Sequence, residues 1–273
     1  AGEKEKEEYV KMLVDEIRNC PDTVQNYRVI SIFFGGGTPS LLTGEQIGRL
    51  MDTVRKIFTL DEDAEITMEM NPGTVTEEKL RKYRQAGVNR LSIGLQSVND
   101  EELRLLGRIH TYEEFREAYH LARANGFSNI NVDLISAIPG QTVESWRRTL
   151  EQVMALSPEH ISAYSLILEE GTTFYKKYVE DEAKEGPKLP DEDAERQMYW
   201  DTETLMEKNG YHRYEISNYA KEGYACLHNL GYWERVPYLG FGIGAASLVP
   251  GDLIGKCRKL EGKMSRYTNP DQL

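Results

Sequence analysis

The sequence has few cysteines, no long apolar run and no excess of positive charge. Its three cysteines, Cys20, Cys226 and Cys257, stand far apart and in no CxxC spacing, which argues against a disulfide framework and favours a reduced, cytoplasmic setting. No run of about 18 apolar residues occurs, so no membrane span is expected. The formal net charge of −12 argues against general nucleic-acid binding and against an anionic membrane surface.

What is present is an ordinary globular composition. The 273 residues are 40% hydrophobic and 29% charged, enough for one large α/β domain or two small ones. Residues 1–19 predict a strongly charged helix at the very start of the chain. Because a domain with a core usually begins with a better anchored segment, we expect native residues to precede Ala1.

Apolar strands and amphipathic helices alternate over the first 170 residues. Capping boxes predict two helix starts, at Thr43 with Gln46 and at Thr111 with Glu114, and Asn99 with Glu102 predicts a short helix between them. This rhythm gives five strand–helix units, which indicates parallel strands with right-handed crossovers. The predicted strands are 28–34, 64–73, 89–97, 130–140 and 160–170.

The rhythm breaks after Gly171. A polar connector at 180–193 precedes a predicted helix at 194–211 and a possible strand at 212–220, and residues 228–247 are rich in glycine and aromatics and are predicted to be mostly loop. Residues 249–273 give no clear signal. We therefore predict a partial-barrel core at 1–170, and the end of the barrel with the start of a further region at 171–273.

Three successive glycines end the first predicted strand and precede Thr38 and Pro39. Such a triplet is typical of a tight turn or of a close approach to the backbone. A phosphate loop is one interpretation, but Pro39 removes one N–H group, no Walker lysine follows and the pattern is not GxGxxG. Backbone carbonyl groups of the same loop could equally approach an ammonium group.

Polar residues interrupt three successive apolar strands near their carboxyl ends: Glu69, Gln96 and Asp133. A single residue of this kind is commonly a structural hydrogen-bonding group, but the repetition predicts a shared site, because active sites of barrel-like sheets form at those ends. Arg108 ends a helix, where it could either complement the helix dipole or bind a carboxylate in a bidentate manner.

Several long segments together resemble one family. These are FFGGGTPSLL, EMNPGTV, RLSIGLQSVNDEELRLLGRIHT, NVDLISAIPGQTVESWRRTL and HISAYSLILEEGT. In this order they resemble radical S-adenosylmethionine (SAM) proteins related to oxygen-independent coproporphyrinogen III dehydrogenase, from about Tyr9 to Ser247. The stretch CLHNLGYW is similar to the signature of the HemW-like haem chaperone branch. The fold implied is an α/β partial barrel of about six βα units, so a first strand is expected before Ala1.

The resemblance also implies a set of SAM-binding residues. The glycine motif would bind the methionyl ammonium through backbone oxygens, Arg108 would meet the methionine carboxylate or a second SAM, and Ala163 with Ala246 would line the adenine pocket. The complete set is Gly36, Gly37, Thr38, Glu69, Gln96, Arg108, Asp133, Ala163 and Ala246.

One family feature is missing from the sequence. The family binds a [4Fe–4S] cluster through CxxxCxxC, which this chain does not contain, so no metal ligand is assigned here. We expect the cluster cysteines upstream of Ala1. With the cluster in place, the resemblance implies reductive cleavage of SAM to a 5′-deoxyadenosyl radical.

His228, Tyr232 and Trp233 lie in the haem chaperone signature. A histidine among aromatic residues is commonly packed or hydrogen-bonded, but imidazole is also a suitable axial haem ligand, and both interpretations stay open. The leading hypothesis is a haem chaperone that passes haem or porphyrin to an acceptor protein. The alternatives are a coproporphyrinogen III dehydrogenase with an electron donor, which would be an enzyme, and a barrel enzyme that binds a phosphorylated metabolite through the glycine loop.

Overall fold

The structure is a computed structural model that describes residues 2–180, 186–251 and 264–270. Contacts within the chain divide it into two compact units. The first unit comprises residues 1–67, 78–89 and 226–273, and the second comprises residues 68–77 and 90–225. Cys257 lies outside the described residues.

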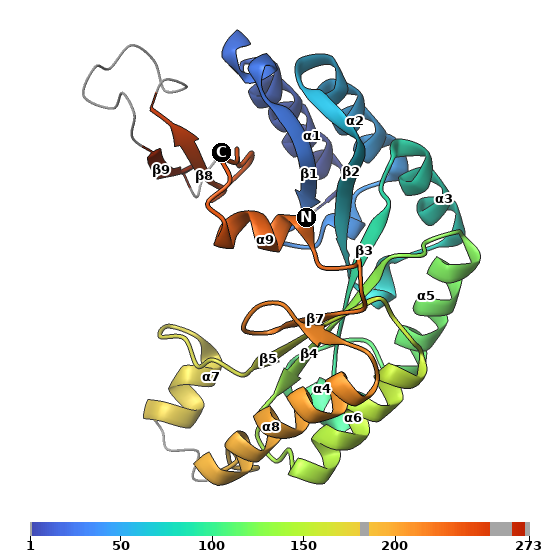
Figure 1. Ribbon diagram of the computed structural model, residues 1–273, viewed down its shortest axis with the longest axis vertical. Helices are drawn as coiled ribbons and strands as arrows, with labels where there is room; N and C mark the ends of the chain where they lie inside the picture. The colour runs from blue at the N-terminus through green and yellow to red at the C-terminus, as the bar shows by residue number, and fades with distance from the viewer. Residues whose placement is uncertain (1, 181–185, 252–263, 271–273) are drawn as a thin grey trace. The chain divides into compact units, whose positions relative to one another are not determined.

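The first unit begins with a helix and a strand that the sequence predicted. In it, β1 neighbours β2, α1 packs against α2, and β8 and β9 form an antiparallel hairpin (Figure 1). Its elements are α1 (Glu3–Arg18), η1 (Asp22–Asn26), β1 (Arg28–Phe34), η2 (Pro39–Leu41), α2 (Gly44–Ile57), most of β2 (Thr59–Met70), α3 (Glu77–Ala86), α9 (Leu227–Trp233), β8 (Ala246–Pro250) and β9 (Met264–Thr268).

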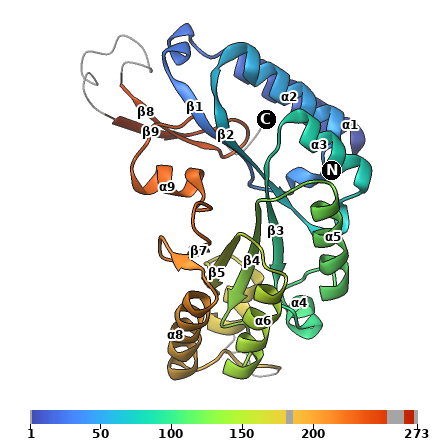
Figure 2. The same ribbon diagram turned by 45° about the vertical axis from the view of Figure 1, so that its right-hand side comes forward.

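The second unit contains the regular βα alternation. Strands β3, β4 and β5 pair in parallel, and β7 and then β6 follow β5 in antiparallel orientation. Figures 1 and 2 show α5 and α6 on one face of these strands. The elements are η3 (Pro72–Thr74), β3 (Arg90–Gln96), α4 (Asp100–Leu105), α5 (Tyr112–Ala124), β4 (Ile130–Ser136), α6 (Val143–Ala155), β5 (His160–Ser165), α7 (Thr173–Tyr175), η4 (Lys176–Glu180), α8 (Glu192–Lys208), β6 (His212–Arg213) and β7 (Asn218–Ala220).

The helix starts follow the capping residues closely. The hydroxyl of Thr43 accepts from Gln46 N and the hydroxyl of Thr111 accepts from Glu114 N, and both capping boxes are complete. At α4 the prediction is half right. Asn99 accepts from the N–H of Glu101, so it is the cap, whereas the carboxylate of Glu102 is used elsewhere.

Glu102 is buried and ties α4 to the start of α6. Its carboxylate accepts from Ser97 Oγ at 2.6 Å and from Gln141 Nε2 at 2.9 Å, and also from Ser145 Oγ. A buried carboxylate is stable only where such donors surround it. Glu102 therefore stabilises the contact between two loops of the second unit instead of closing a capping box with Asn99.

Three further predictions need correction. β1 is half-buried to exposed, whereas a buried strand was expected. The possible strand at 212–220 is two short antiparallel strands, β6 and β7. The stretch at 228–247, predicted as loop, contains α9 and the start of β8. The division at residue 170 stays a prediction.

Candidate functional site

The glycine loop after β1 has space beside two of its residues. Gly36 has a φ of +97°, a conformation that only glycine adopts without strain. A Cβ atom added to Gly36 or Gly37 would meet no atom within 4 Å, so space adjoins both residues. The loop enters a three-residue 3₁₀ turn at Pro39, not an α-helix, so it lacks the helix N-terminus that a phosphate loop uses.

Two side chains of α3 donate hydrogen bonds to the backbone just after the glycines. Lys79 Nζ donates to the carbonyl of Ser40 at 2.8 Å, and the hydroxyl of Tyr83 donates to the carbonyl of Leu42 at 2.6 Å. Tyr83 is fully buried, and burial raises its pKa, so the phenol keeps the proton that it donates. The position of the loop is therefore set by distant residues as well as by its glycines.

In the second unit, the register of the sheet aligns the predicted polar residues. Asp133 on β4 lies opposite Gly94 on β3 and opposite Ser162 on β5. Gln96 and Ala163 lie one row further toward the carboxyl ends, opposite the same β4 residue. The parallel pairing thus brings these three predicted residues to adjacent rows of neighbouring strands.

Gln96 has an unusual backbone conformation. Its φ is +76°, and the β3–β4 register shifts between Gly94 and Gln96. A residue with a side chain seldom adopts positive φ, and such conformations cluster at functional sites. The alternating pattern of the sequence could not reveal this irregularity at the end of β3.

Asp133 is held by two neighbouring side chains. Ser92 Oγ donates to Asp133 Oδ2 and Asn131 Nδ2 donates to Asp133 Oδ1, both at 2.9 Å. Burial raises the pKa of the Asp133 carboxyl, and these hydrogen bonds oppose that shift. Each carboxylate oxygen can accept more than one hydrogen bond, so Asp133 retains acceptor capacity for a ligand.

Arg108 follows α4 after a turn at Gly107, whose φ is +71°. Burial lowers the pKa of Arg108, and the charge of Asp133 partly offsets that effect. Arg108 therefore interacts electrostatically with Asp133. Arg108 lies beyond Leu105, the last residue of α4, and so is not part of that helix.

The two units divide the predicted SAM residues between them. Glu69, Gln96, Arg108, Asp133 and Ala163 belong to the second unit. Glu69 is half-buried on the last residues of β2, and the N–H of Ala163 donates to the carbonyl of Ser217 at 2.8 Å.

The first unit contains the glycine loop, Ala246 and His228. Ala246 begins β8, and its carbonyl oxygen would lie only 2.2 Å from a Cβ added to Gly240. Gly240 is thus required for the close approach of two backbone segments next to Ala246.

His228 lies on α9 within a series of aromatic rings. Its imidazole stacks on Phe33 of β1 with centroids 4.6 Å apart, and the ring of Tyr232 meets it edge-on at 4.8 Å. Tyr232 in turn contacts Tyr238. Tyr232 and Trp233 are 49% and 57% exposed, so aromatic surface faces solvent beside the histidine.

Sequence reasoning missed Glu65, which fixes the start of α9. Its buried carboxylate accepts from the N–H of Leu227 at 3.1 Å, from the N–H of His228 at 3.4 Å and from the thiol of Cys226 at 3.3 Å. A carboxylate at a helix N-terminus satisfies N–H groups that have no partner within the helix. The one available signal was an acidic residue in an apolar strand.

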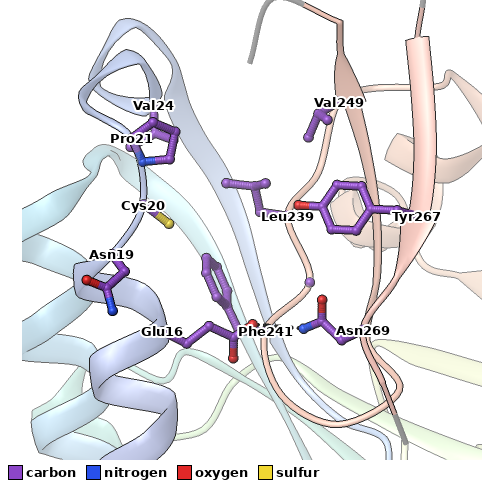
Figure 3. Close-up of a pocket in the computed structure, with 11 residues that line it drawn as sticks. Glu16, Asn19, Cys20, Pro21, Val24, Leu239, Phe241, Val249, Tyr267 and Asn269 are labelled. Carbon is purple, nitrogen blue, oxygen red and sulfur yellow. Dashed lines mark hydrogen bonds between the residues drawn. The ribbon is translucent and has the colours of Figure 1, made fainter. Parts of the chain in front are cut away.

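A pocket of about 260 Å³ lies in the first unit, apart from the predicted residues. Figure 3 shows Glu16 and Asn269 pointing toward each other across it. Glu16 accepts from Asn269 Nδ2 at 2.8 Å and from the N–H of Gly242 at 2.9 Å. These contacts tie α1 to the β8–β9 hairpin, so the polar wall of this pocket has a structural function.

The described residues contain no group of three or more histidine, cysteine or acidic side chains that could hold a metal ion. Within them, Cys20 is half-buried and Cys226 is buried, and neither forms a disulfide with another described residue. Residues 2–180, 186–251 and 264–270 also include no helix long and apolar enough to cross a membrane.

Comparisons with known proteins agree with the sequence prediction. Residues 2–153 match the family model of the Radical SAM superfamily. The proteins named heme chaperone HemW from Escherichia coli and Haemophilus influenzae are 43% and 42% identical to this chain, over 89% and 84% of its length. The chain spans 62% and 58% of those two relatives.

Among solved structures, coproporphyrinogen III oxidase (HemN) from Escherichia coli, described as a radical SAM enzyme, matches with a TM-score of 0.77 at 26% identity. The match covers 98% of this chain and 60% of that protein. It confirms the predicted fold class, an α/β partial barrel of the radical SAM type.

Proposed function

Since the chain belongs to the radical SAM superfamily, we propose that it binds SAM through the residues that the sequence predicted for this role. Gly36, Gly37 and Thr38 would offer backbone groups to the methionyl ammonium. Asp133 would accept hydrogen bonds from the nucleoside, and Arg108 would pair with the methionine carboxylate. When bound, SAM supplies a sulfonium carbon–sulfur bond that one-electron reduction cleaves.

The residues present suit SAM but not the cluster. The open space beside Gly36 and Gly37 and the oriented carboxylate of Asp133 support a ligand with an ammonium group and hydroxyl groups. The described residues offer no cysteine set for a [4Fe–4S] cluster. No described residue of this chain is therefore assigned to the cluster.

We further propose that the protein carries haem in the cytoplasm and passes it to an acceptor protein. The observation that carries this proposal is the position of the chaperone signature on α9. His228 and Tyr232 lie one helical turn apart in ring contact, and the exposed rings of Tyr232 and Trp233 offer an apolar surface on which a porphyrin could stack. The proteins that match this chain at 43% and 42% identity are named as haem chaperones.

A haem titration tests the proposal. Haemin is added to the anaerobically purified protein, and absorbance in the Soret region is recorded for wild type, His228→Ala and the control His212→Ala. His212 is an exposed histidine on β6. We expect a shifted Soret band with His228→Ala and an unchanged band with His212→Ala, and identical spectra for both variants would reject His228 as a ligand.

The second candidate is coproporphyrinogen III dehydrogenase activity, which the similarity to HemN favours. Incubation with coproporphyrinogen III and SAM separates the two functions, provided that the protein used includes the cluster cysteines expected upstream of Ala1 and that its cluster is reconstituted and reduced. Formation of protoporphyrinogen would support the enzyme. Haem binding without that product would support the chaperone.

A further inference from the structure

A buried chain of hydrogen bonds in the second unit joins Asp133 to His160. The predicted SAM-binding set does not include this histidine. His160 on β5 is fully buried. Its Nδ1 lies 2.6 Å from Asn131 Oδ1, and its Nε2 lies 2.7 Å from the hydroxyl of Tyr214. Asn131 is also buried and lies between His160 and Asp133 on the neighbouring strand.

Ser92 fixes the direction of the hydrogen bonds around Asn131. Its hydroxyl gives its one proton to Asp133 Oδ2, so Ser92 Oγ accepts from Asn131, and the Asn131 atom that lies 2.9 Å from Asp133 Oδ1 is the Nδ2 donor. The same Nδ2 donates to Ser92 Oγ at 2.7 Å, and Ser92 donates onward to Asp133 Oδ2. Asn131 Oδ1 therefore faces His160 as an acceptor.

It follows that His160 carries its proton on Nδ1. Since Asn131 Oδ1 accepts, Nδ1 must donate, and Nε2 must accept from the hydroxyl of Tyr214. Burial, with a smaller contribution from the charge of Arg90, lowers the pKa of His160 well below 6.5, which is consistent with a neutral imidazole. Ser162 Oγ lies 3.1 Å from Asn131 Oδ1, but the closer acceptor for its one proton is Asn218 Oδ1 at 2.6 Å.

We propose that His160 and Asn131 are positioning residues for SAM binding, because the Nδ1–H tautomer of His160 locks the Asn131 amide and thereby aims Asp133 at the ligand. This inference rests on the proposed binding of SAM by Asp133. Without the hydrogen bond from His160, the Asn131 amide could rotate and turn its Oδ1 toward the carboxylate of Asp133. The hydrogen bond from Asn131 Nδ2 to Asp133 would then be replaced by a repulsion between two oxygen atoms.

Other charged and titratable groups surround this chain of hydrogen bonds, and they affect how the protonation of Asp133 and His160 depends on pH. Arg90 lies on β3 and Arg108 follows α4. Tyr164 lies on β5, and Tyr214 and Glu215 lie between β6 and β7. Of these, Arg90 and Arg108 are cations that favour an ionised Asp133.

Nuclear magnetic resonance tests the tautomer directly. Long-range ¹H–¹⁵N correlation spectra of the ¹⁵N-histidine-labelled protein should show His160 protonated at Nδ1 and bare at Nε2 from pH 6 to 8. The assignment follows from the signal that is lost in His160→Asn. Protonation at Nε2 alone would overturn the proposal.

SAM affinity tests the positioning role with near-isosteric variants. Asn131→Asp places a second carboxylate beside Asp133, so we expect SAM binding about tenfold weaker at pH 8, with partial recovery at pH 6. His160→Leu should also weaken binding about tenfold, whereas His160→Asn, whose amide nitrogen can replace Nδ1–H, should restore most of it. Thr149→Val, a buried change on α6 outside the chain of hydrogen bonds, is the control.

Asp133→Asn separates this proposal from the proposed function. If Asp133→Asn binds SAM as tightly as wild type, the assignment of Asp133 itself fails. If Asp133→Asn loses binding while Asn131→Asp and His160→Leu retain it at every pH, only the positioning role is overturned. Thermal unfolding of each variant shows whether it is folded, and Tyr214→Phe provides a milder change should His160→Leu not fold.

Discussion

The two units present their candidate groups in opposite ways. In the second unit, Asp133 is joined to side chains of β3 and β4 by hydrogen bonds of 2.9 Å, so its polar atoms are oriented within the protein. In the first unit, the candidate groups are the backbone of Gly36 and Gly37, beside which an added Cβ atom would meet no neighbour within 4 Å, and the exposed rings of α9. The second unit should therefore be sensitive to changes of polarity, and the first to added volume and to loss of its supports.

The largest effect is expected at the support of α9. Glu65→Ala leaves buried donors at the start of the helix without their carboxylate acceptor, which should lower the free energy of unfolding by about 2–3 kcal/mol. Urea denaturation measures this loss. Glu62→Ala, an exposed change on the same strand, is the matched control, and an equal response of the two variants would contradict the role of Glu65.

The glycine loop offers a pair of variants that separates stability from binding. Gly36→Ala forces a side chain into positive φ and should lower the free energy of unfolding by about 1–2 kcal/mol. Gly37→Ala has no such strain and meets no atom within 4 Å, so its stability should match wild type in thermal denaturation. Comparable losses of stability in both variants would contradict the claim that only Gly36 needs the positive φ of glycine.

The second unit should lose stability in mild acid because of His160. Its pKa is lowered in the folded protein, so the unfolded chain binds the extra proton and stability falls as the pH drops below the ordinary value of 6.5. We expect about 1 kcal/mol less stability at pH 5.5 than at pH 7.5 from this residue. In denaturant titrations at the two pH values, His160→Asn should remove this difference in the free energy of unfolding. An unchanged difference would argue against the contribution of His160.

The smallest effect is expected outside both candidate regions. Arg196 and Asp193 form an exposed ion pair on α8, which water screens effectively. Arg196→Gln should change the free energy of unfolding by less than about 0.5 kcal/mol. A larger change in the free energy of unfolding, measured by urea denaturation, would contradict the expectation that exposed ion pairs contribute little to the stability of this protein.

Much of the second unit was predictable from the sequence because its signals are local. The residues of β3 to β5 form apolar runs, and Thr111 with Glu114 marks the start of α5. Gln96 and Asp133 stood out as polar residues in such runs. The register of parallel strands then places them on neighbouring rows, as the sequence suggested.

The parts that escaped prediction depend on partners distant in the chain. Helix α9 contains Gly231 and three aromatic or imidazole rings, a composition typical of a loop, yet Glu65 caps it from more than 160 positions away. Likewise, the hydrogen bonds of His160 join β5 to Asn131 on β4 and to Tyr214 in the loop between β6 and β7. The positive φ of Gln96 arises from a register shift that no local pattern encodes.

The most direct test of the central claim is equilibrium binding of SAM to the anaerobically purified protein and to Gly37→Ala. Gly48→Ala, an equally unobstructed glycine on α2, serves as the control. Binding of SAM by wild type and by Gly48→Ala, with a loss of at least about tenfold in Gly37→Ala, is the predicted result. Equal binding by all three proteins, or no binding by wild type, would contradict the account.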